Sequence, residues 1–300
     1  MLVSMKDILV RASKENYAVA APNVGTELDA RAAIEVAEEI KSPLILDVGY
    51  KANPDIVFYG QMLRQLAIQA NVPVAINLDH GGSYEQCVNA LQGGFTSVMI
   101  DRSAESFEKN VADTSEVVKL AHAAGASVEA ELGHVGQASN AEEDTKSHLT
   151  EPEVAKDFIE KTGVDMLAVA IGTAHGAYPK GFVPKLDHER LAAIKEAVGQ
   201  DFPLVLHGSS GTPEDELVKV CSHGINKVNI ANDLCNAITA ALNERHLEGQ
   251  AAYEVWAVIT TAFKDKLRHM MVDVYGSANK AWVPENKGVT AGGVSSMEEK

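Results

Sequence analysis

The chain has 300 residues, of which 46% are hydrophobic, and its 42 acidic and 26 basic residues give a formal charge of −16 at pH 7. This balance, without any cluster of lysine and arginine, argues against nucleic acid as a partner. No apolar run approaches the roughly 20 residues that span a bilayer, and Cys87, Cys221 and Cys235 form no CxxC pair, so we expect buried thiols, no membrane association and a cytoplasmic location.

Apolar runs typical of β-strands alternate with segments of helical character along the whole chain. The opening segment, residues 4–16, is predicted to be a helix that could close the floor of a barrel. The predicted strands are 17–22, 43–48, 72–78, 96–100, 126–132, 166–171, 203–206 and 227–230. Helical segments between them include 28–41, 152–163, 187–199 and 214–224, several of which end in glycine as helices commonly do.

Strand and helix alternate eight times, and the strands are too continuously apolar to have a solvent-exposed face. This pattern predicts a parallel sheet closed as a (β/α)8 TIM barrel, an α/β fold. We expect one domain over residues 1–284 and a flexible tail of Gly, Ser and charged residues over 285–300. The unpatterned stretch 133–150 is long enough to be a functional lid or disordered. A doubly wound sheet, the alternative, would carry GxGxxG after the first strand, where this chain has APNVGTE.

Polar residues follow or occupy the ends of several predicted strands. Chemistry in such a barrel lies at the carboxyl ends of the strands. The candidates there are Asp79, His80, Asp101, Glu129, Glu131, His175 and His207. Any single histidine among them would be read as structural, but three imidazoles around one axis are a ligand set for a catalytic Zn2+ with an open position. Such an ion polarises a carbonyl or stabilises an enediolate.

A second pattern at the seventh and eighth strands suits a phosphate group. The Gly-Ser-Ser-Gly loop at 208–211 offers backbone N–H groups and hydroxyls, and residues 229–233 open a helix whose amino-terminal dipole favours an anion. A tight turn followed by a helix N-cap would explain Asn232 and Asp233 by themselves. It would not explain why the Gly/Ser loop begins at His207, a candidate metal ligand.

The motifs LDHG, DRS, VEAELGHVG, DMLAVAIGTAHGAY, PLVLHGSSG and KVNIANDL resemble, in this order, those of the metal-dependent (class II) ketose-bisphosphate aldolases. The compact chain is closer to the tagatose-bisphosphate type than to the longer fructose-bisphosphate type. The resemblance implies reversible aldol cleavage of a ketose 1-phosphate or 1,6-bisphosphate into dihydroxyacetone phosphate and an aldehyde. It implies a zinc-stabilised enediolate rather than a lysine Schiff base, and a homodimer or homotetramer.

The resemblance also assigns roles to individual residues. His80, His175 and His207 would bind the zinc, and Asp79 would be the general acid/base on the hydroxyl at the bond being broken. The carboxylates near the metal, able to hold a displaced or second cation, would be Asp101 and Glu131. A pocket for dihydroxyacetone phosphate, typically with a monovalent cation (Na+ or K+), would be formed by Asn23, Gly176, Gly208, Ser209, Ser210, Asn229, Ala231 and Asn232.

Some features depart from the family pattern. The family's proton shuttle is a glutamate on the loop after the fifth strand, and Glu142 or Glu143 could fill that role, although GQASNAEED spaces its acids differently. Gly25 and Gly49 replace polar side chains, which leaves open whether the aldehyde is phosphorylated. Two alternatives remain. A noncatalytic aldolase-like subunit would lack a ligand or the base, and another zinc-dependent barrel enzyme would usually carry HxH on an early strand.

Overall fold

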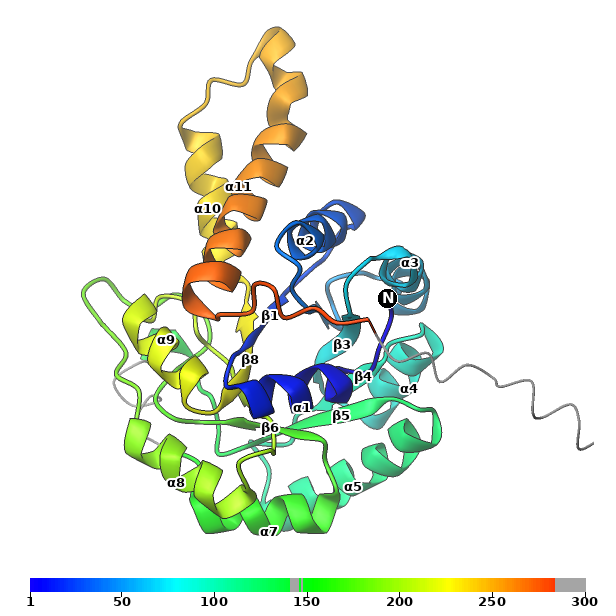
Figure 1. The fold of residues 1–300 in the computed structure, drawn as a ribbon, viewed down its shortest axis with the longest axis vertical. Helices are drawn as coiled ribbons and strands as arrows, with labels where there is room; N and C mark the ends of the chain where they lie inside the picture. The colour runs from blue at the N-terminus through cyan, green and yellow to red at the C-terminus, as the bar shows by residue number, and fades with distance from the viewer. Residues whose placement is uncertain (141–145, 147, 284–300) are drawn as a thin grey trace, which may run out of the picture.

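The computed structural model describes residues 1–140, 146 and 148–283, and shows a barrel of parallel strands surrounded by helices (Figure 1). The strands are β1 Val19–Pro22, β2 Leu44–Gly49, β3 Val74–Gly81, β4 Ser97–Ile100, β5 Ser127–Leu132, β6 Met166–Val169, β7 Leu204–Leu206 and β8 Ile225–Ile230. They form one eight-stranded sheet in the order β1-β8-β7-β6-β5-β4-β3-β2. A bridge between Asn23 and Asp47 links the two edge strands, so the predicted (β/α)8 barrel is confirmed.

Six of the ten helices named next begin at a residue whose side chain caps the first turn. They are α1 Met5–Glu15, α2 Glu27–Glu39, α3 Ile56–Gln69, α4 Tyr84–Gln92, α5 Phe107–Ala123, α7 Pro152–Thr162, α8 His188–Val198, α9 Glu214–Ser222, α10 Asn232–Asn243 and α11 Val255–His269. Thr26 and Asp29 form a capping box at the start of α2, for example, and Gly163 ends α7 at a φ of 72°. No helix in the described part of the chain is long and apolar enough to cross a membrane.

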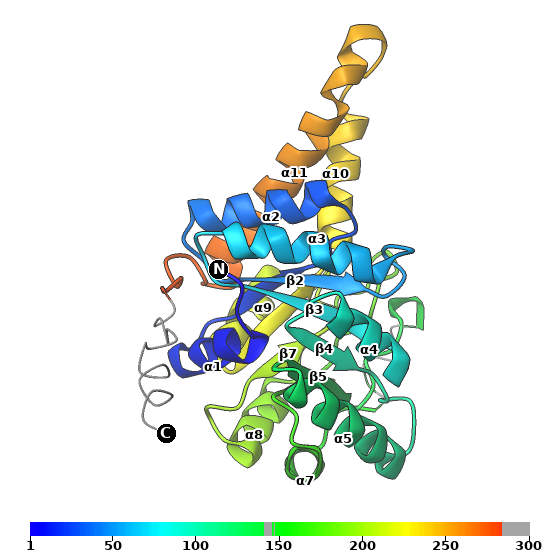
Figure 2. The ribbon, with the colours of Figure 1, turned by 90° about the vertical axis from the view of Figure 1, so that its right-hand side faces the viewer.

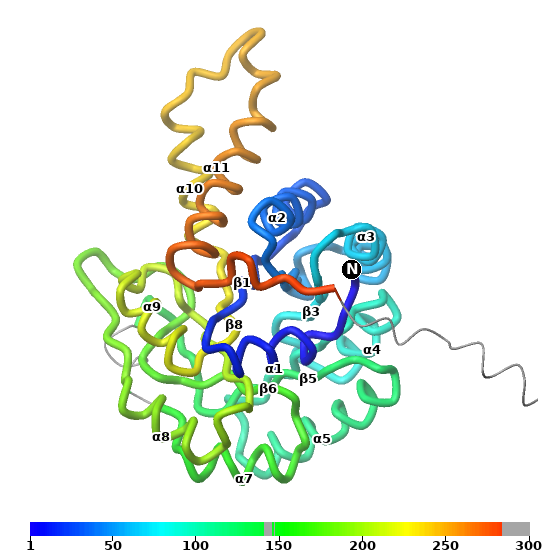
Figure 3. The backbone as a smooth tube through the Cα atoms, viewed as in Figure 1, coloured from blue at the N-terminus to red at the C-terminus, as the bar shows by residue number. Residues whose placement is uncertain are grey.

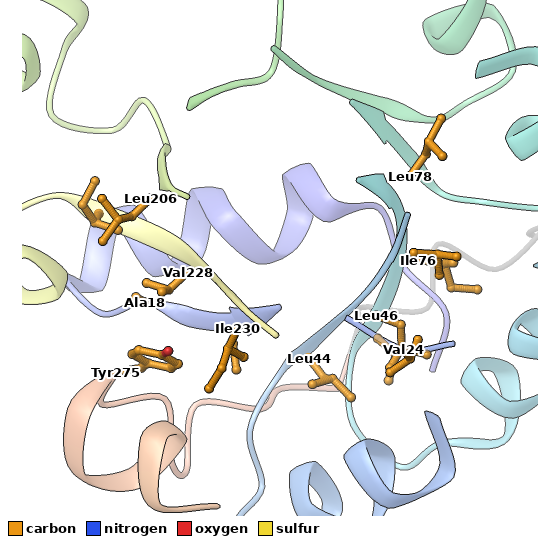
Figure 4. Packing of buried hydrophobic residues seen from close by; sticks show 14 of the residues in the cluster. Ala18, Val24, Leu44, Leu46, Ile76, Leu78, Leu206, Val228, Ile230 and Tyr275 are labelled. Atoms are coloured by element: carbon orange, nitrogen blue, oxygen red, sulfur yellow. The ribbon is translucent and has the colours of Figure 1, made fainter. Parts of the chain in front are cut away.

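The barrel wall separates two apolar layers because successive strand residues point to opposite faces. Outward residues of the strands, such as Leu44, Leu46 and Ile76, belong to the core that the surrounding helices share (Figure 4). Inward residues such as Ile45 and Ala75 instead pack against α1. This helix runs across the amino-terminal opening of the barrel (Figure 3), where the sequence predicted a closing helix.

Above that apolar floor the barrel interior becomes polar. Moving two residues along a strand keeps a side chain inside and raises it by one layer. The buried polar residues reached in this way are Asp47, Asn77, Glu129 and Lys227, followed by Asp79, Glu131, His207 and Asn229. The upper members of this series lie toward the carboxyl ends of the strands, where TIM barrels place their chemistry.

A helical hairpin stands clear of the barrel. After β8 the chain continues into α10, passes through the short 3-10 helix Gly249–Glu254 and returns along α11. The hairpin projects beyond α2 in both views (Figures 1 and 2). The sequence predicted a helix that begins at residues 229–233 but gave no indication of α11 or of the projection.

Candidate metal centre and active site

Asp79 and His80 occupy an irregular end of β3. The pairing of β3 with β4 shifts between Leu78 and Gly81, and His80 has a φ of 101°. A positive φ is uncommon for a residue other than glycine and marks local strain. In a regular strand the two neighbouring side chains would point to opposite faces. Here the bulge turns the backbone so that both side chains line one cavity.

Three histidines converge beside this bulge. Their ring centroids lie 5.2 Å apart for His80 and His175, 4.6 Å for His80 and His207, and 5.6 Å for His175 and His207. One ligand atom from each ring and one from Glu131 all lie within 4.8 Å of one another. The residues come from β3, β5 and the segments that follow β6 and β7, so barrel closure brings them together from across the chain.

The donor atoms in this group suit a divalent cation. His80 Nε2, His207 Nδ1 and Glu131 Oε2 are buried and have no hydrogen-bond partner in the described part of the chain. His207 Nδ1 and Glu131 Oε2 are 3.2 Å apart but are not aligned for a hydrogen bond. Buried polar atoms without partners are costly, and a shared cation would satisfy all three. Imidazole nitrogens with one carboxylate oxygen are ligands that zinc accepts.

Carboxylates hold the opposite ring nitrogens. His80 Nδ1 lies 2.9 Å from Asp101 Oδ2, and His207 Nε2 lies 2.8 Å from Glu129 Oε1. A carboxylate that accepts from one ring N–H leaves the other nitrogen free to bind a metal. Asp101, grouped with the metal residues in the sequence analysis, therefore lies behind His80 and outside the converging atoms.

Burial and neighbouring charges shift the pKa values of His175 and His207 in opposite directions. Burial, together with the charges of His207 and His80, lowers the pKa of His175 to about 4, so this imidazole is neutral at pH 7. Burial opposes protonation of His207 as well, but its hydrogen bond to Glu129 and the neighbouring carboxylate of Glu131 raise its pKa to about 10. In the metal-free protein at pH 7 His207 is therefore a cation with a proton on both ring nitrogens. An incoming metal must displace the proton on Nδ1.

We expect metal affinity to rise with pH for this reason. His207 is protonated below its pKa of about 10, so binding releases a proton throughout the neutral range and affinity should increase by about tenfold per pH unit. Competition with a chromophoric chelator between pH 6 and 8, where the buffer and chelator are corrected for their own protonation, measures the slope. A flat profile would contradict the assignment of His207 as a ligand.

Asp79 is an ionised carboxylate held by two amides. Asn23 Nδ2 donates to its Oδ2 at 2.7 Å, and Asn229 Nδ2 donates to its Oδ1 at 2.9 Å. Burial alone would raise the pKa of this carboxyl, but the charges of His80 and Lys227 lower it to about 2. Asp79 Oδ1 lies 3.5 Å from His80 Nε2, so the carboxylate borders the candidate metal position and can accept a proton from a group bound there.

A cavity of about 420 Å³ opens above these residues, within the size range of small-molecule sites. The cavity is lined by all eight residues expected to form the substrate pocket, together with Asp79, His80 and His175. The remaining lining residues are Gly25 and Gly49, which the sequence analysis noted only as departures from the family pattern, and Val24 and Ala52, which it did not name. These are small or apolar and carry no functional group that a motif would reveal.

One end of the cavity offers backbone donors to an anion. Helix α10 begins after Ala231, whose side chain cannot accept a hydrogen bond from the first turn. The N–H of Asp233 donates instead to Ser210 Oγ of the neighbouring loop, at 3.3 Å, and the start of the helix still favours an anion. The β7–α9 loop approaches closely because Gly208 has a φ of 64° and no Cβ. A Cβ there would meet the carbonyl oxygen of Ala174 at 2.5 Å.

Replacing Gly208 with alanine should therefore weaken substrate binding. The added methyl must displace either its own loop or that of Ala174, which moves the donors of the anion end. We expect KM for the phosphorylated substrate to rise by about tenfold or more, the scale of one or two lost hydrogen bonds to a charged group. Steady-state kinetics at saturating metal give this value, and an unchanged KM would remove the loop from the phosphate site.

Two predicted residues cannot be placed, since Glu142 and Glu143 lie outside the described residues. Two further buried residues lie close to the site: Glu129, which the sequence analysis counted as a candidate without giving it a role, and Lys227, which it did not name. Both sit two positions before a predicted site residue on the same strand, Glu131 and Asn229 respectively. Strand alternation was therefore the signal that could have identified them.

The chain matches the family model described as class II fructose-bisphosphate aldolase over residues 3–280. The chain belongs to this family. It is 43% identical to the fructose-bisphosphate aldolase of Thermus caldophilus over 272 residues, which cover 81% of this chain and 87% of that protein. It is 37% identical to the fructose-bisphosphate aldolase of Geobacillus stearothermophilus over 291 residues, covering 93% and 99% of the two chains.

The fold agrees with this membership. The crystal structure of the YdjI aldolase from Escherichia coli K12 superposes with a TM-score of 0.83 at 35% identity, covering 94% of this chain and 100% of that one. This class II aldolase is therefore a metal-dependent lyase that cleaves a carbon–carbon bond of phosphorylated ketoses. The aldolase activity predicted from the sequence motifs is confirmed at this level, and the exact ketose is a separate question.

Proposed function

We propose that this class II aldolase uses zinc, held by His80, His175 and His207, to cleave a ketose 1-phosphate or 1,6-bisphosphate into dihydroxyacetone phosphate and an aldehyde. The observation that carries the proposal is the convergence of three imidazoles and Glu131 on one point beside a fixed carboxylate. The same cavity offers an anion its backbone donors. Metal and phosphate positions in one cavity suit a phosphorylated ketone.

The metal ligands are His80 through Nε2, His207 through Nδ1, and His175, with Glu131 as the carboxylate next to them. A divalent cation bound there supplies Lewis-acid stabilisation for the negative charge that develops on the ketone oxygen. Asp101 and Glu129 orient the first two rings through their other nitrogens. Nitrogen ligands in this number favour zinc over magnesium or calcium.

Asp79 moves the proton during bond cleavage. Its carboxylate accepts the proton of the substrate hydroxyl next to the bond that breaks, and returns it when the reaction runs in the direction of condensation. The amides of Asn23 and Asn229 hold both carboxylate oxygens, so the group does not have to reorganise during the reaction. We assign the proton exchange at the nucleophilic carbon to Glu142 or Glu143, in line with the resemblance described in the sequence analysis.

The phosphate of dihydroxyacetone phosphate is placed at the loops after β7 and β8, against Gly208, Ser209, Ser210 and the first turn of α10. None of the described residues that line the cavity is a lysine or an arginine. A bound monovalent cation, Na+ or K+, would therefore balance charge that the protein leaves uncompensated. Dependence of KM on the identity of the monovalent salt tests this part of the proposal.

Chelation and borohydride together test the chemistry. Removal of metal with a chelator should abolish cleavage, because the charge that develops on the substrate oxygen then has no counter-charge. Added Zn2+ should restore cleavage. Borohydride added with the substrate should leave the enzyme active and unmodified. A trapped, covalently modified lysine observed by mass spectrometry would contradict the metal-dependent route.

A panel of aldehydes identifies the substrate class. Dihydroxyacetone phosphate is offered with phosphorylated and unphosphorylated aldehydes of increasing length, and condensation is measured as the consumption of dihydroxyacetone phosphate. A positive reaction with any of them supports the proposal, while the ranking of kcat/KM decides between a ketose 1-phosphate and a 1,6-bisphosphate. Failure with every aldehyde at full metal occupancy would reject the assigned reaction.

We also propose that the enzyme is a homodimer or homotetramer that uses the projecting hairpin of α10 and α11. Tyr253 and Trp256 on this hairpin are 83% and 66% exposed, an unusual position for large aromatic side chains in a monomer. Sedimentation should therefore give a mass that is a multiple of 32.0 kDa. A Trp256→Glu variant should lower that mass, and a monomeric parent would reject this part of the proposal.

A further inference from the structure

Lys227 is a fully buried cation below the floor of the cavity. Its Nζ donates to Asn229 Oδ1 at 2.7 Å and lies 3.0 Å from Asp47 Oδ2 and 2.9 Å from Glu129 Oε2. The side chain has no exposed surface and is not among the residues that line the cavity. It therefore cannot reach a substrate, and its ammonium group already has one hydrogen bond and two ion-pair partners, so it is not poised to act as a nucleophile.

The first connection from Lys227 leads to the metal position. Glu129 uses one carboxylate oxygen for Lys227 and the other for His207 Nε2, at 2.8 Å. The ammonium thus holds the carboxylate turned toward His207. This orientation keeps the ring proton on Nε2 and leaves Nδ1 for the metal.

The second connection leads to the general base. An ammonium group can only donate hydrogen bonds, so Lys227 selects the amide orientation of Asn229 in which Oδ1 faces downward. The NH2 group of Asn229 must then face Asp79, where it donates to Oδ1 at 2.9 Å. If the amide turned over, two acceptor oxygens would face each other and Asp79 would lose one of its two supports.

We propose that Lys227 is a positioning residue that orients the metal ligand His207, through Glu129, and the base Asp79, through Asn229. One buried charge then aligns the two halves of the reaction, metal binding and proton transfer, which come from different strands. The inference rests on the proposed function of the site, because it needs His207 as a ligand and Asp79 as the base. It goes beyond that function by assigning a role to a residue that touches neither substrate nor metal.

The chain offers a matched control in Lys195. This second buried lysine is 3% exposed, and its Nζ also has three acceptors: Ser13 Oγ at 3.0 Å, Gln200 O at 2.8 Å and Phe202 O at 2.7 Å. Those acceptors lie before β7, at the amino-terminal side of the barrel and away from the cavity. A merely structural contribution of a buried lysine should appear equally in both positions.

The experiment compares Lys227→Met with Lys195→Met in the full-length enzyme. Both variants should lose thermal stability. Only Lys227→Met should bind Zn2+ more weakly, by about 10- to 100-fold in a chelator competition, the scale of lost support behind a ligand. Only this variant should have an altered Co2+ absorption spectrum, and at saturating metal its kcat should stay below that of the parent with KM unchanged.

Lys227→Met leaves two carboxylates unpaired and can fail to fold, so Glu129→Gln provides a second measurement. Glutamine presents one acceptor oxygen where glutamate presents two, so it cannot serve His207 Nε2 and Lys227 together, and the connection between Lys227 and His207 is broken. Zn2+ affinity should fall, whereas kcat should recover at saturating metal because the connection through Asn229 remains.

Two results would overturn the inference. One is a folded Lys227→Met variant with the metal affinity, Co2+ spectrum and kcat of the parent. The other, decisive if Lys227→Met does not fold, is an unchanged Zn2+ affinity in Glu129→Gln. Metal binding and cleavage by the parent, measured in the same series, test the proposed function separately.

Discussion

The His207→Ala variant is expected to lose its bound metal and, with it, aldol cleavage. His207 is completely buried, and its Nδ1 has no hydrogen-bond partner among the residues that the structure describes. Removal of this ring leaves two imidazoles and one carboxylate, and it also takes away the partner of Glu129. We expect bound zinc to fall to background and cleavage to fall by about 10³-fold or more, because the stabilisation of the developing charge is lost.

Metal analysis of the purified protein, with cleavage assayed in parallel, measures both effects. His188→Ala is a suitable control, since His188 also binds a carboxylate, Glu216, at 2.8 Å, but lies on α8 away from the cavity. The control should keep its zinc and its activity. A His207→Ala protein with a full complement of zinc would disprove the ligand assignment.

The Asp79→Ala variant should separate metal binding from proton transfer. Asp79 borders the metal residues but is not one of the four that converge. Zinc should therefore stay bound, while kcat should drop by about 10²- to 10⁴-fold, the usual contribution of a positioned acid or base. The measurement is kcat at saturating substrate in protein of known zinc content, and near-normal turnover would reject Asp79 as the base.

Asn23→Ala makes a graded companion to this variant. It removes one of the two amides that hold Asp79 and leaves the carboxylate itself in place. A smaller loss of kcat than in Asp79→Ala is expected, because Asn229 still supports the other oxygen. Equal losses in both variants would mean that position, rather than the presence of the carboxylate, limits the rate.

The sequence predicted the barrel because apolar strands and capped helices alternate regularly, and each of these signals is local. It could not predict how Asp79 and His80 face the same cavity. That arrangement depends on a register shift between β3 and β4 and on the positive φ of His80, which arise from the packing of two strands. The predicted run also ended at residue 78, whereas β3 continues to Gly81.

The candidate site shows the same division between local and long-range information. All eight predicted pocket residues line one cavity, since each lies at or beyond the carboxyl end of a strand, and the fold brings these ends to one face. The position of Asp101 behind His80 and the network around Lys227 depend on contacts between different strands. The projection of the α10–α11 hairpin likewise has no local signature (Figure 2).

Anomalous diffraction from crystals of the zinc-loaded enzyme, collected on both sides of the zinc absorption edge, tests the central claim most directly. We predict one strong peak at about 2.1 Å from His80 Nε2, His207 Nδ1 and a ring nitrogen of His175. A zinc peak elsewhere in the molecule, with these three rings left without metal, would contradict the account.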